Sequence, residues 1–166
     1  MNSSREIVIE IFEEHSKVNF YSLRYVSEEL SETDIFFENV LDQENLKEDV
    51  EIISKMIDKI GEHGAEPRHF RNAGSKSDKV GALPEYLKSS KLRLYAIRLN
   101  NEIVILGNGG VKDTKTYNED PFLNGCVELL KKIDYFLGIK LSNHKVFIFR
   151  KQLMGDLKFY IKDEKK

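Results

Sequence analysis

The sequence predicts one α+β domain, a mainly antiparallel sheet with about three helices packed on one side of it. Residues 91–106 contain two apolar strands with a short polar connection, and residues 42–61 and 120–138 have the periodicity of amphipathic helices. Because predicted hairpins outnumber predicted βαβ crossovers, antiparallel pairing is expected to dominate. A chain of 166 residues, 40% of them hydrophobic, can bury one core of ordinary size. Residues 1–166 are therefore expected to form a single domain.

The N-terminal part should contain two strands and two helices. Residues 5–12 and 18–26 are rich in β-branched and aromatic residues, which favours strands. A short helix is expected to start at Ser31. A longer one has Asp42 as its candidate N-cap, and Gly61 and Gly64 lie where it is expected to end. Apolar residues of the longer helix recur at spacings of three and four, at Leu46, Val50, Ile53, Ile57 and Ile60.

The central part should contain a basic loop and a hairpin. Residues 64–90 have no clear periodicity and predict an irregular connection. The strands at 91–99 and 102–106 are separated by Asn100-Asn101, which favours a tight primed turn. Strand pairing is expected to stop at residues 107–110, Gly-Asn-Gly-Gly, and the polar residues that follow should reach solvent.

The C-terminal part should contain a third helix and a last hairpin. Asp120 is the expected N-cap and Pro121 lies in the first turn, where its missing N–H costs nothing. The helix is expected to end at Gly138. Two further strands, at residues 145–150 and 157–161, are expected to pair with each other across residues 154–156.

Charge is distributed unevenly along the chain, although the net charge is only −2. Residues 1–66 hold 6 Lys and Arg against 17 Asp and Glu, whereas residues 67–117 hold 10 against 4. A basic segment with interspersed Tyr and Phe is what a polyanion-binding face needs. A solvated loop whose lysines only maintain solubility fits the same pattern.

Cysteine content and hydropathy suggest the compartment. The single cysteine, Cys126, excludes an internal disulfide and lies in an apolar helical pattern, so it is expected to be a core residue. No apolar run approaches the roughly 20 residues of a membrane span, and the first residues lack the layout of a secretory signal. The expected location is the cytoplasm, with no membrane association.

Familiar catalytic patterns are weak. His63, Glu66 and His69 offer three metal ligands, but Gly64 and Pro67 interrupt the helix that would align them. The glycines at 107–110 lack the spacing of a phosphate-binding loop. The histidines at 15, 63, 69 and 144 are too scattered to indicate a Ser-His-Asp set. No metal and no cofactor are expected.

Several short motifs follow the long helix in a fixed order. They are Phe70-Arg71, Leu92-Arg-Leu-Tyr95, Ile103-Val-Ile-Leu-Gly107, the Lys112 to Tyr117 segment and the helix from Asp120 to Phe136. This order resembles the RelE/ParE superfamily of toxins of type II toxin–antitoxin systems, which includes RelE-like and HigB-like proteins. In that family a helical hairpin is followed by an F-R-type turn, a strand with the pattern x-R-[ILV]-x-[YF], a strand ending in glycine or small residues, a lysine-rich segment and a closing helix. The resemblance covers about residues 42–138. It implies a RelE-like core with an N-terminal strand extension and a C-terminal hairpin.

The resemblance also implies a chemistry. Many members cut messenger RNA, often on the ribosome, by attack of a ribose 2′-OH on the neighbouring phosphate, without a metal. Arg93 is then expected to clamp the scissile phosphate. Lys112 and Lys115 are expected to add positive charge and to lower the pKa of Tyr117, a candidate proton-transfer group. RNA-binding residues are expected in the basic loop, at Arg68, His69, Arg71 and Lys76.

Two other functions remain open at this point. A toxin of the same fold can inhibit a protein, such as a topoisomerase, without cutting RNA, and a protein of this fold can be a binding module without catalysis. The expected partners are a cognate antitoxin and RNA or the ribosome. The RNA target and the antitoxin-binding surface do not follow from the sequence.

Overall fold

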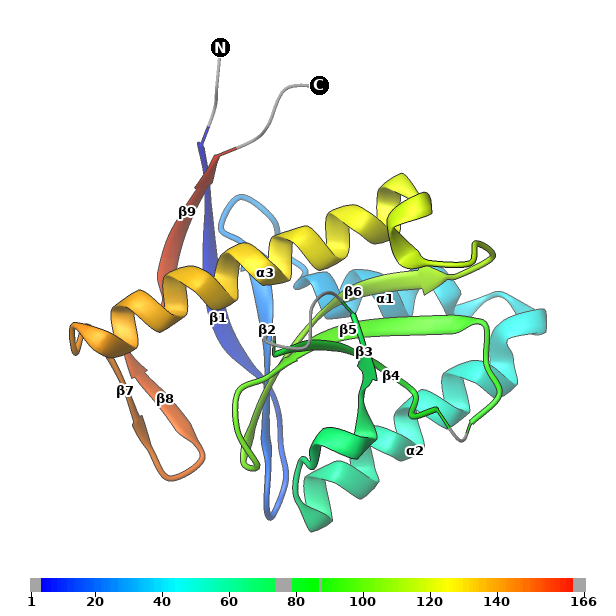
Figure 1. Ribbon diagram of the computed structural model, residues 1–166, viewed down its shortest axis with the longest axis horizontal. Coiled ribbons are helices and arrows are strands. Elements are labelled where there is room, and N and C mark those ends of the chain that lie inside the picture. Colours follow the sequence, from blue (N-terminus) through cyan, green and yellow to red (C-terminus); the bar gives the residue numbers. More distant parts are fainter. Residues whose placement is uncertain (1–3, 74–78, 87, 163–166) are drawn as a thin grey trace.

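The computed structural model describes residues 4–73, 79–86 and 88–162, which form a seven-stranded sheet flanked by helices (Figure 1). The strands of this sheet are β1 (Ser4–Glu14), β2 (Asn19–Tyr25), β3 (Arg71–Asn72), β4 (Val80–Leu83), β5 (Leu92–Arg98), β6 (Ile103–Val111) and β9 (Lys158–Lys162). Their spatial order is β3-β4-β5-β6-β2-β1-β9. Only β2 and β6 pair in parallel, so the α+β class with a mainly antiparallel sheet is confirmed.

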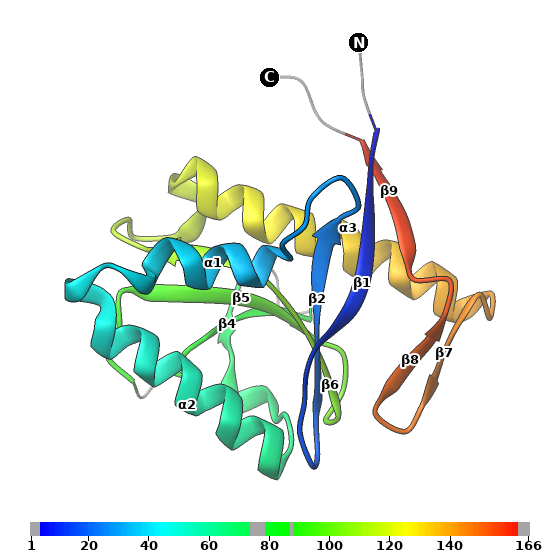
Figure 2. The same ribbon diagram turned by 180° about the vertical axis from the view of Figure 1, so that it is seen from behind.

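Helices cover both faces of the sheet, so the expectation of helices on one side is wrong. The helices α1 (Glu32–Leu41) and α2 (Lys47–His63) pack on one face, and α3 (Pro121–Ser142) packs on the other (Figures 1 and 2). Short 3-10 helices span Glu44–Leu46, Pro67–His69 and Tyr117–Glu119. Helices are needed on both faces because β5 and β6 carry buried residues on both faces. A strand of this kind must be covered from both sides.

The first two helices differ from the prediction at one cap. The predicted start of the first helix is correct: Ser31 is the N-cap of α1 and forms a capping box with Asp34. The prediction that Asp42 caps α2 is wrong, because its backbone N–H donates to Val40 and ends α1. At the other end, α2 passes Gly61 and stops at Gly64, the second of the two glycines expected there, which has a φ of 111°.

The third helix begins as predicted and ends later. The Oδ1 atom of Asp120 accepts hydrogen bonds from the backbone N–H groups of Phe122 and Leu123, at 2.9 and 3.1 Å. Gly138 does not end the helix, which continues to Ser142. Apolar contact continues beyond the glycine, since Leu141 packs against the buried core.

The Asp120 cap supplies the first testable prediction. Replacing Asp120 with alanine leaves two N–H groups of α3 without acceptors, and we expect the free energy of unfolding to fall by about 1 kcal/mol. Urea unfolding followed by circular dichroism measures this loss. Asp113→Ala is the control, because Asp113 is exposed in the preceding loop and caps no helix. Equal effects of the two substitutions would contradict a capping role.

The central hairpin forms, but its turn and its length differ from the prediction. The Oδ1 atom of Asn100 accepts from the backbone N–H groups of Glu102 and Ile103, at 2.8 and 2.9 Å. No primed turn forms, because the non-glycine residues with positive φ in the described ranges are His144 and Arg150. Pairing also continues through residues 107–110, up to the Leu92–Val111 pair. Gly109 allows this, since it lets the backbones of β5 and β6 approach closely.

The segment at 64–90 and the C-terminus hold strands that were not predicted correctly. The expected irregular connection contains β3 and β4, which are too short for a clear periodicity. The last hairpin consists of β7 (Val146–Phe149) and β8 (Gln152–Gly155), a separate two-stranded sheet. The predicted pairing of residues 145–150 with 157–161 is wrong. Instead β9 joins β1, because its alternate residues Phe159 and Ile161 complete the core under α3.

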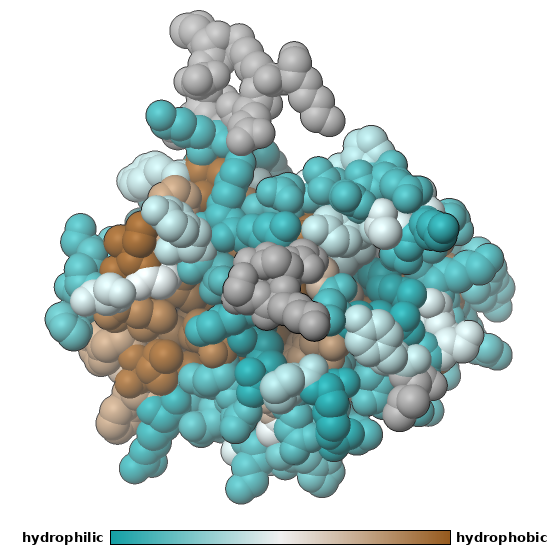
Figure 3. Space-filling view, in the orientation of Figure 1, coloured by the Kyte–Doolittle hydropathy of each residue, from teal (hydrophilic) through white to brown (hydrophobic). Residues whose placement is uncertain are grey.

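The surface is divided between an apolar and a hydrophilic part. Hydrophobic residues gather on the left of Figure 3, over the C-terminal half of α3 and the β7–β8 hairpin. The exposed large hydrophobic residues of these elements are Tyr135, Phe136, Ile139, Phe147, Ile148, Phe149 and Met154. The rest of this face is mainly hydrophilic. None of the described helices has the length and apolar character needed to cross a membrane.

Candidate functional site

A pocket of about 260 Å³ lies on the α3 side of the sheet, where β3, β4 and β5 meet the loop after β6. Its lining residues are Arg71, Asn72, Ala73, Ala82, Tyr86, Arg93, Tyr95, Lys112, Lys115, Thr116 and Tyr117. Four of these carry a positive charge and three are tyrosines, and none is a carboxylate. We call this the cationic pocket.

The register of the strands creates the pocket. Arg71 pairs with Ala82 and Ala82 pairs with Tyr95, so the three side chains lie in one row on the same face of the sheet. Ala82 is small, and it leaves a hollow between two large neighbours. Arg93 comes two residues before Tyr95 on β5, so both side chains point to this face.

Arg93 is held by the backbone at the rim of the pocket. Its Nη1 atom donates to the carbonyls of Ser90 and Leu92, at 2.6 and 3.1 Å. Burial and then the nearby Arg71 guanidinium lower the pKa of Arg93, although arginine stays charged at neutral pH. Asp49 opposes this shift, but its carboxylate accepts the backbone N–H of Lys91. Across residues 4–73, 79–86 and 88–162, no carboxylate forms an ion pair with either guanidinium.

Arg71 holds one wall of the pocket in place. Its guanidinium donates to the carbonyls of Pro84 at 2.8 Å and Lys88 at 2.7 Å. It also lies over the ring of Tyr86, with 5.3 Å between the guanidinium carbon and the ring centroid. The Tyr86 hydroxyl accepts the backbone N–H of Asn72 at 2.8 Å. Tyr86 is 61% exposed, so a face of a fixed aromatic ring is open to a ligand.

The loop after β6 forms the opposite wall. The Nζ atom of Lys112 donates to the carbonyl of Lys115 at 3.0 Å, which bends the loop over the pocket. The ring of Tyr117 packs edge-on against Tyr95, with 6.2 Å between centroids. Its hydroxyl accepts from Lys131 of α3 at 3.5 Å. Lysine charge and a tyrosine hydroxyl therefore meet at the same wall.

Tyr95 forms the floor of the pocket and has an unusual hydroxyl. The residue is 2% exposed, and its hydroxyl has no hydrogen-bond partner in the described residues. Burial is the main cause that raises the pKa of Tyr95, so the phenol stays protonated. A buried donor without a partner is costly, and a ligand in the pocket can accept a hydrogen bond from it.

The structure brings together five of the eight predicted site residues. Arg71, Arg93, Lys112, Lys115 and Tyr117 all line the cationic pocket. Arg68 and His69 do not line it. Arg68 pairs with Glu66, and His69 is buried with Nδ1 accepting the Glu66 backbone N–H at 3.1 Å. Burial lowers the pKa of His69, which favours its neutral form. Lys76 lies outside the described residues.

Two tyrosines that line the pocket, Tyr95 and Tyr86, are not among the predicted site residues. Tyr95 had a signal, because a residue two positions after Arg93 on a strand must share its face. Tyr86 had none, since it lies in a stretch without periodicity and reaches the pocket through its contacts with Arg71 and Asn72.

Cys126 lies in the core beside this site. It packs under α3 with 8% of its surface exposed, and burial raises its pKa to about 12, so the prediction of a core thiol is confirmed. An unfolded thiol has a pKa of about 8.5, and we expect the native thiol to react with Ellman's reagent at pH 8 roughly a thousandfold more slowly than the unfolded one. Absorbance at 412 nm with and without urea tests this expectation. Rapid labelling of the native protein would contradict the burial.

No protein-family model matches this chain, and no curated protein and no solved structure matches it. What the cationic pocket can do therefore follows from its side chains. Fixed guanidinium groups bind phosphate, flexible lysines add charge, and phenols donate hydrogen bonds or stack on bases. An anionic ligand with aromatic parts fits this combination best.

Proposed function

We propose that this protein is an endoribonuclease whose active site, the cationic pocket, needs no metal, and that it acts as a toxin of the RelE/ParE kind. The observation that carries the proposal is the composition of the pocket, where four cations and three tyrosines meet without a carboxylate among the lining residues. Phosphate contacts supply most of the affinity of proteins for nucleic acid, and such contacts need cations that are not already neutralised.

In the proposed reaction, the ribose 2′-oxygen attacks the adjacent phosphorus while the bond from phosphorus to the 5′-oxygen breaks. The 2′-OH proton leaves to a base, and a proton is delivered to the departing 5′-oxygen. The products carry a 2′,3′-cyclic phosphate and a 5′-hydroxyl. Arg93 binds the phosphate and stabilises the charge that develops on its oxygens. Lys112 and Lys115 add positive charge, and Tyr117 exchanges a proton with one of the two ribose oxygens.

The other lining residues support RNA as the ligand. Single-stranded RNA is commonly recognised by stacking of unpaired bases on aromatic side chains. The exposed Tyr86 ring, held by Arg71, offers such a surface next to the cations. The unpartnered Tyr95 hydroxyl can donate to a phosphate or ribose oxygen.

The order of helices and strands also supports the proposal, because it agrees with the order expected from the resemblance to the RelE/ParE superfamily. The helices α1 and α2 precede three consecutive antiparallel strands, β4, β5 and β6, and α3 follows. The expected family order places the strand with the arginine directly before the strand that ends in small residues, and here Arg93 lies on β5, followed by β6 with its glycines. Under this proposal the partners are the ribosome with its message and a cognate antitoxin, and the location is the cytoplasm.

The test is messenger RNA integrity in a bacterial translation extract. Primer extension would follow a defined message after addition of the purified protein, the Arg93→Ala variant or buffer. We expect discrete cuts only with the unaltered protein. A parallel reaction with naked RNA separates direct cleavage from cleavage that requires translating ribosomes.

Two outcomes would contradict the proposal. Intact message in the extract, together with growth arrest on induction in cells, would favour a toxin that inhibits a protein. Intact message and normal growth would favour a binding module. Circular dichroism of Arg93→Ala must match the unaltered protein, so that loss of cutting reflects the site and not the fold.

A further inference from the structure

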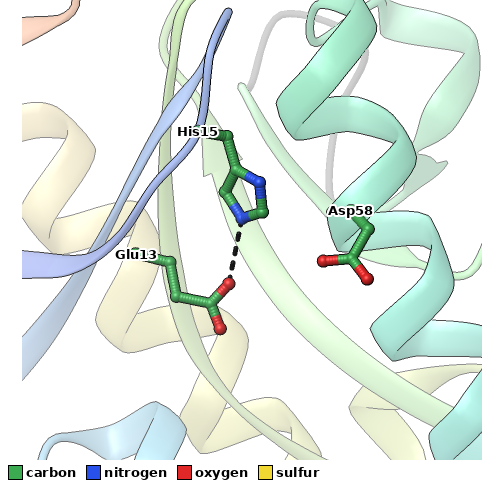
Figure 4. A group of neighbouring side chains, drawn as sticks. All are labelled: Glu13, His15 and Asp58. Atoms are coloured by element: carbon green, nitrogen blue, oxygen red, sulfur yellow. Dashed lines mark hydrogen bonds and ion pairs between the residues drawn. The ribbon is translucent and has the colours of Figure 1, made fainter.

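A second group of polar side chains lies on the other face of the sheet, away from the cationic pocket. Glu13 is near the end of β1, His15 is in the turn between β1 and β2, and Asp58 is on α2 (Figure 4). One potential ligand atom of each residue lies within 4.8 Å of the others. The sequence motif His63, Glu66 and His69 forms no such group, and among the described residues this is the one cluster of three potential ligands.

The three donors lie near enough to one another for their side chains to reach one zinc ion. Zn²⁺ binds imidazole nitrogen and carboxylate oxygen at about 2.0–2.2 Å, so neighbouring donors in a tetrahedral site lie roughly 3.3–3.5 Å apart. The His15 Nε2 and Glu13 Oε2 atoms are 3.0 Å apart. Figure 4 shows the Asp58 carboxylate on the other side of the imidazole ring, directed towards it. Both carboxylates are exposed, so their side chains are free to rotate towards an ion bound at the imidazole.

The turn that carries His15 is fixed against α2. The backbone N–H groups of Lys17 and Val18 both donate to the carbonyl of Gly61, at 2.8 and 3.2 Å. The imidazole lies on Gly61, where a Cβ atom would be 2.3 Å from His15 Cγ. On its other side it packs edge-on against Phe20, with 5.5 Å between ring centroids. His15 is thus positioned by contacts that do not use its Nε2 atom.

The charges around the cluster also suit a cation. Asp58 forms no ion pair with any residue that the structure describes, and the only pair of Glu13 is with His15 itself. Lys151 is one cation near the cluster, and its Nζ atom donates to the carbonyls of His15 and Ser16 and so holds the turn. The surrounding residues 1–66 are strongly acidic, which raises the local concentration of cations.

We propose that Glu13, His15 and Asp58 bind one divalent transition-metal ion, with Zn²⁺ as the best fit and water in the fourth position. An imidazole with two carboxylates favours Zn²⁺ over Mg²⁺ and Ca²⁺, which prefer oxygen ligands alone. The bound ion would join the β1–β2 turn to α2 and stabilise the fold. Its role is separate from the cationic pocket and does not depend on the proposed ribonuclease activity.

Isothermal titration of the full-length, EDTA-treated protein with ZnCl₂ at pH 7.5 tests the proposal. We expect one zinc ion per chain and a rise in the melting temperature with ZnCl₂ but not with MgCl₂ or CaCl₂. Asp58→Asn and Glu13→Gln should each weaken zinc binding about tenfold or more, since each replaces one of the two carboxylate ligands with a neutral amide. Both side chains are at the surface, so both variants are expected to fold.

Matched controls locate the site. Glu14→Gln changes the neighbouring carboxylate, and His63→Gln removes an exposed histidine of the same helix as Asp58, so neither should change zinc affinity. Absence of zinc binding would overturn the proposal. Binding that persists unchanged in both Asp58→Asn and Glu13→Gln would overturn it as well, because the ion would then lie elsewhere.

Discussion

Replacing Arg93 with lysine is expected to lower kcat/KM for RNA cleavage about 100-fold, although the positive charge is kept. A guanidinium offers a planar set of donors that matches two phosphate oxygens, whereas an ammonium group offers a point charge on a flexible stem. Arg93 is also placed by its hydrogen bonds to the carbonyls of Ser90 and Leu92, which a lysine cannot reproduce at the same position. The measurement is the initial rate on a short oligoribonucleotide or, if ribosomes are required, on a message in a translation extract.

Arg98→Lys is the matched control for this experiment. Arg98 lies on the same strand, is half-buried like Arg93 and also has its pKa lowered by burial, but it bonds the carbonyl of Ala65 and does not line the pocket. We expect its activity to stay within about twofold of the unaltered protein. An Arg93→Lys variant that folds and cleaves at the normal rate would exclude Arg93 as the phosphate ligand.

The cationic pocket was partly predictable because strand geometry is local. Arg93 was placed on a strand by the apolar pattern around it, and the lysines at 112 and 115 were placed in the loop that follows the hairpin. Arg71 was expected only as part of a basic loop. Its position beside Tyr95 depends on the pairing of β3 with β4 and of β4 with β5, which no local pattern reveals. For the same reason the sequence could not show that Arg71 lines the pocket and Arg68 does not, since the Arg68 side chain pairs with Glu66.

The fold was predictable where a structural feature depends only on residues close together in the sequence. The cap at Asp120 and the capping box at Ser31 depend on residues three or fewer positions apart, and both form. The pairing of β9 with β1 depends on residues at opposite ends of the chain, so an adjacent partner was wrongly preferred. The cluster of Glu13, His15 and Asp58 was not predictable for the same reason, since the turn after β1 meets α2 only in the complete fold.

The glycines of β6 link the fold to the pocket, and they provide the prediction with the largest expected effect on stability. At Gly109 a Cβ atom would lie 1.9 Å from the carbonyl oxygen of Arg93 and 3.0 Å from the Cα atom of Leu94. These are backbone atoms of the neighbouring strand and cannot move without separating β5 from β6. We therefore expect Gly109→Ala to lower the free energy of unfolding by about 3 kcal/mol. Any protein that still folds should have lost most of the proposed RNA cleavage, because the displaced backbone carries Arg93.

Gly110→Ala is the matched control for this effect. The next glycine lies on the same strand, but its Cβ atom would be 3.5 Å from a side-chain carbon of Leu123, which is an ordinary contact. We expect its free energy of unfolding to stay within about 1 kcal/mol of that of the unaltered protein. Urea unfolding of the two variants under the same conditions measures the difference. If Gly109→Ala were as stable as Gly110→Ala, the close approach of β5 and β6 would be wrong, and so would the pairing of Leu94 with Gly109 that positions Arg93 at the pocket.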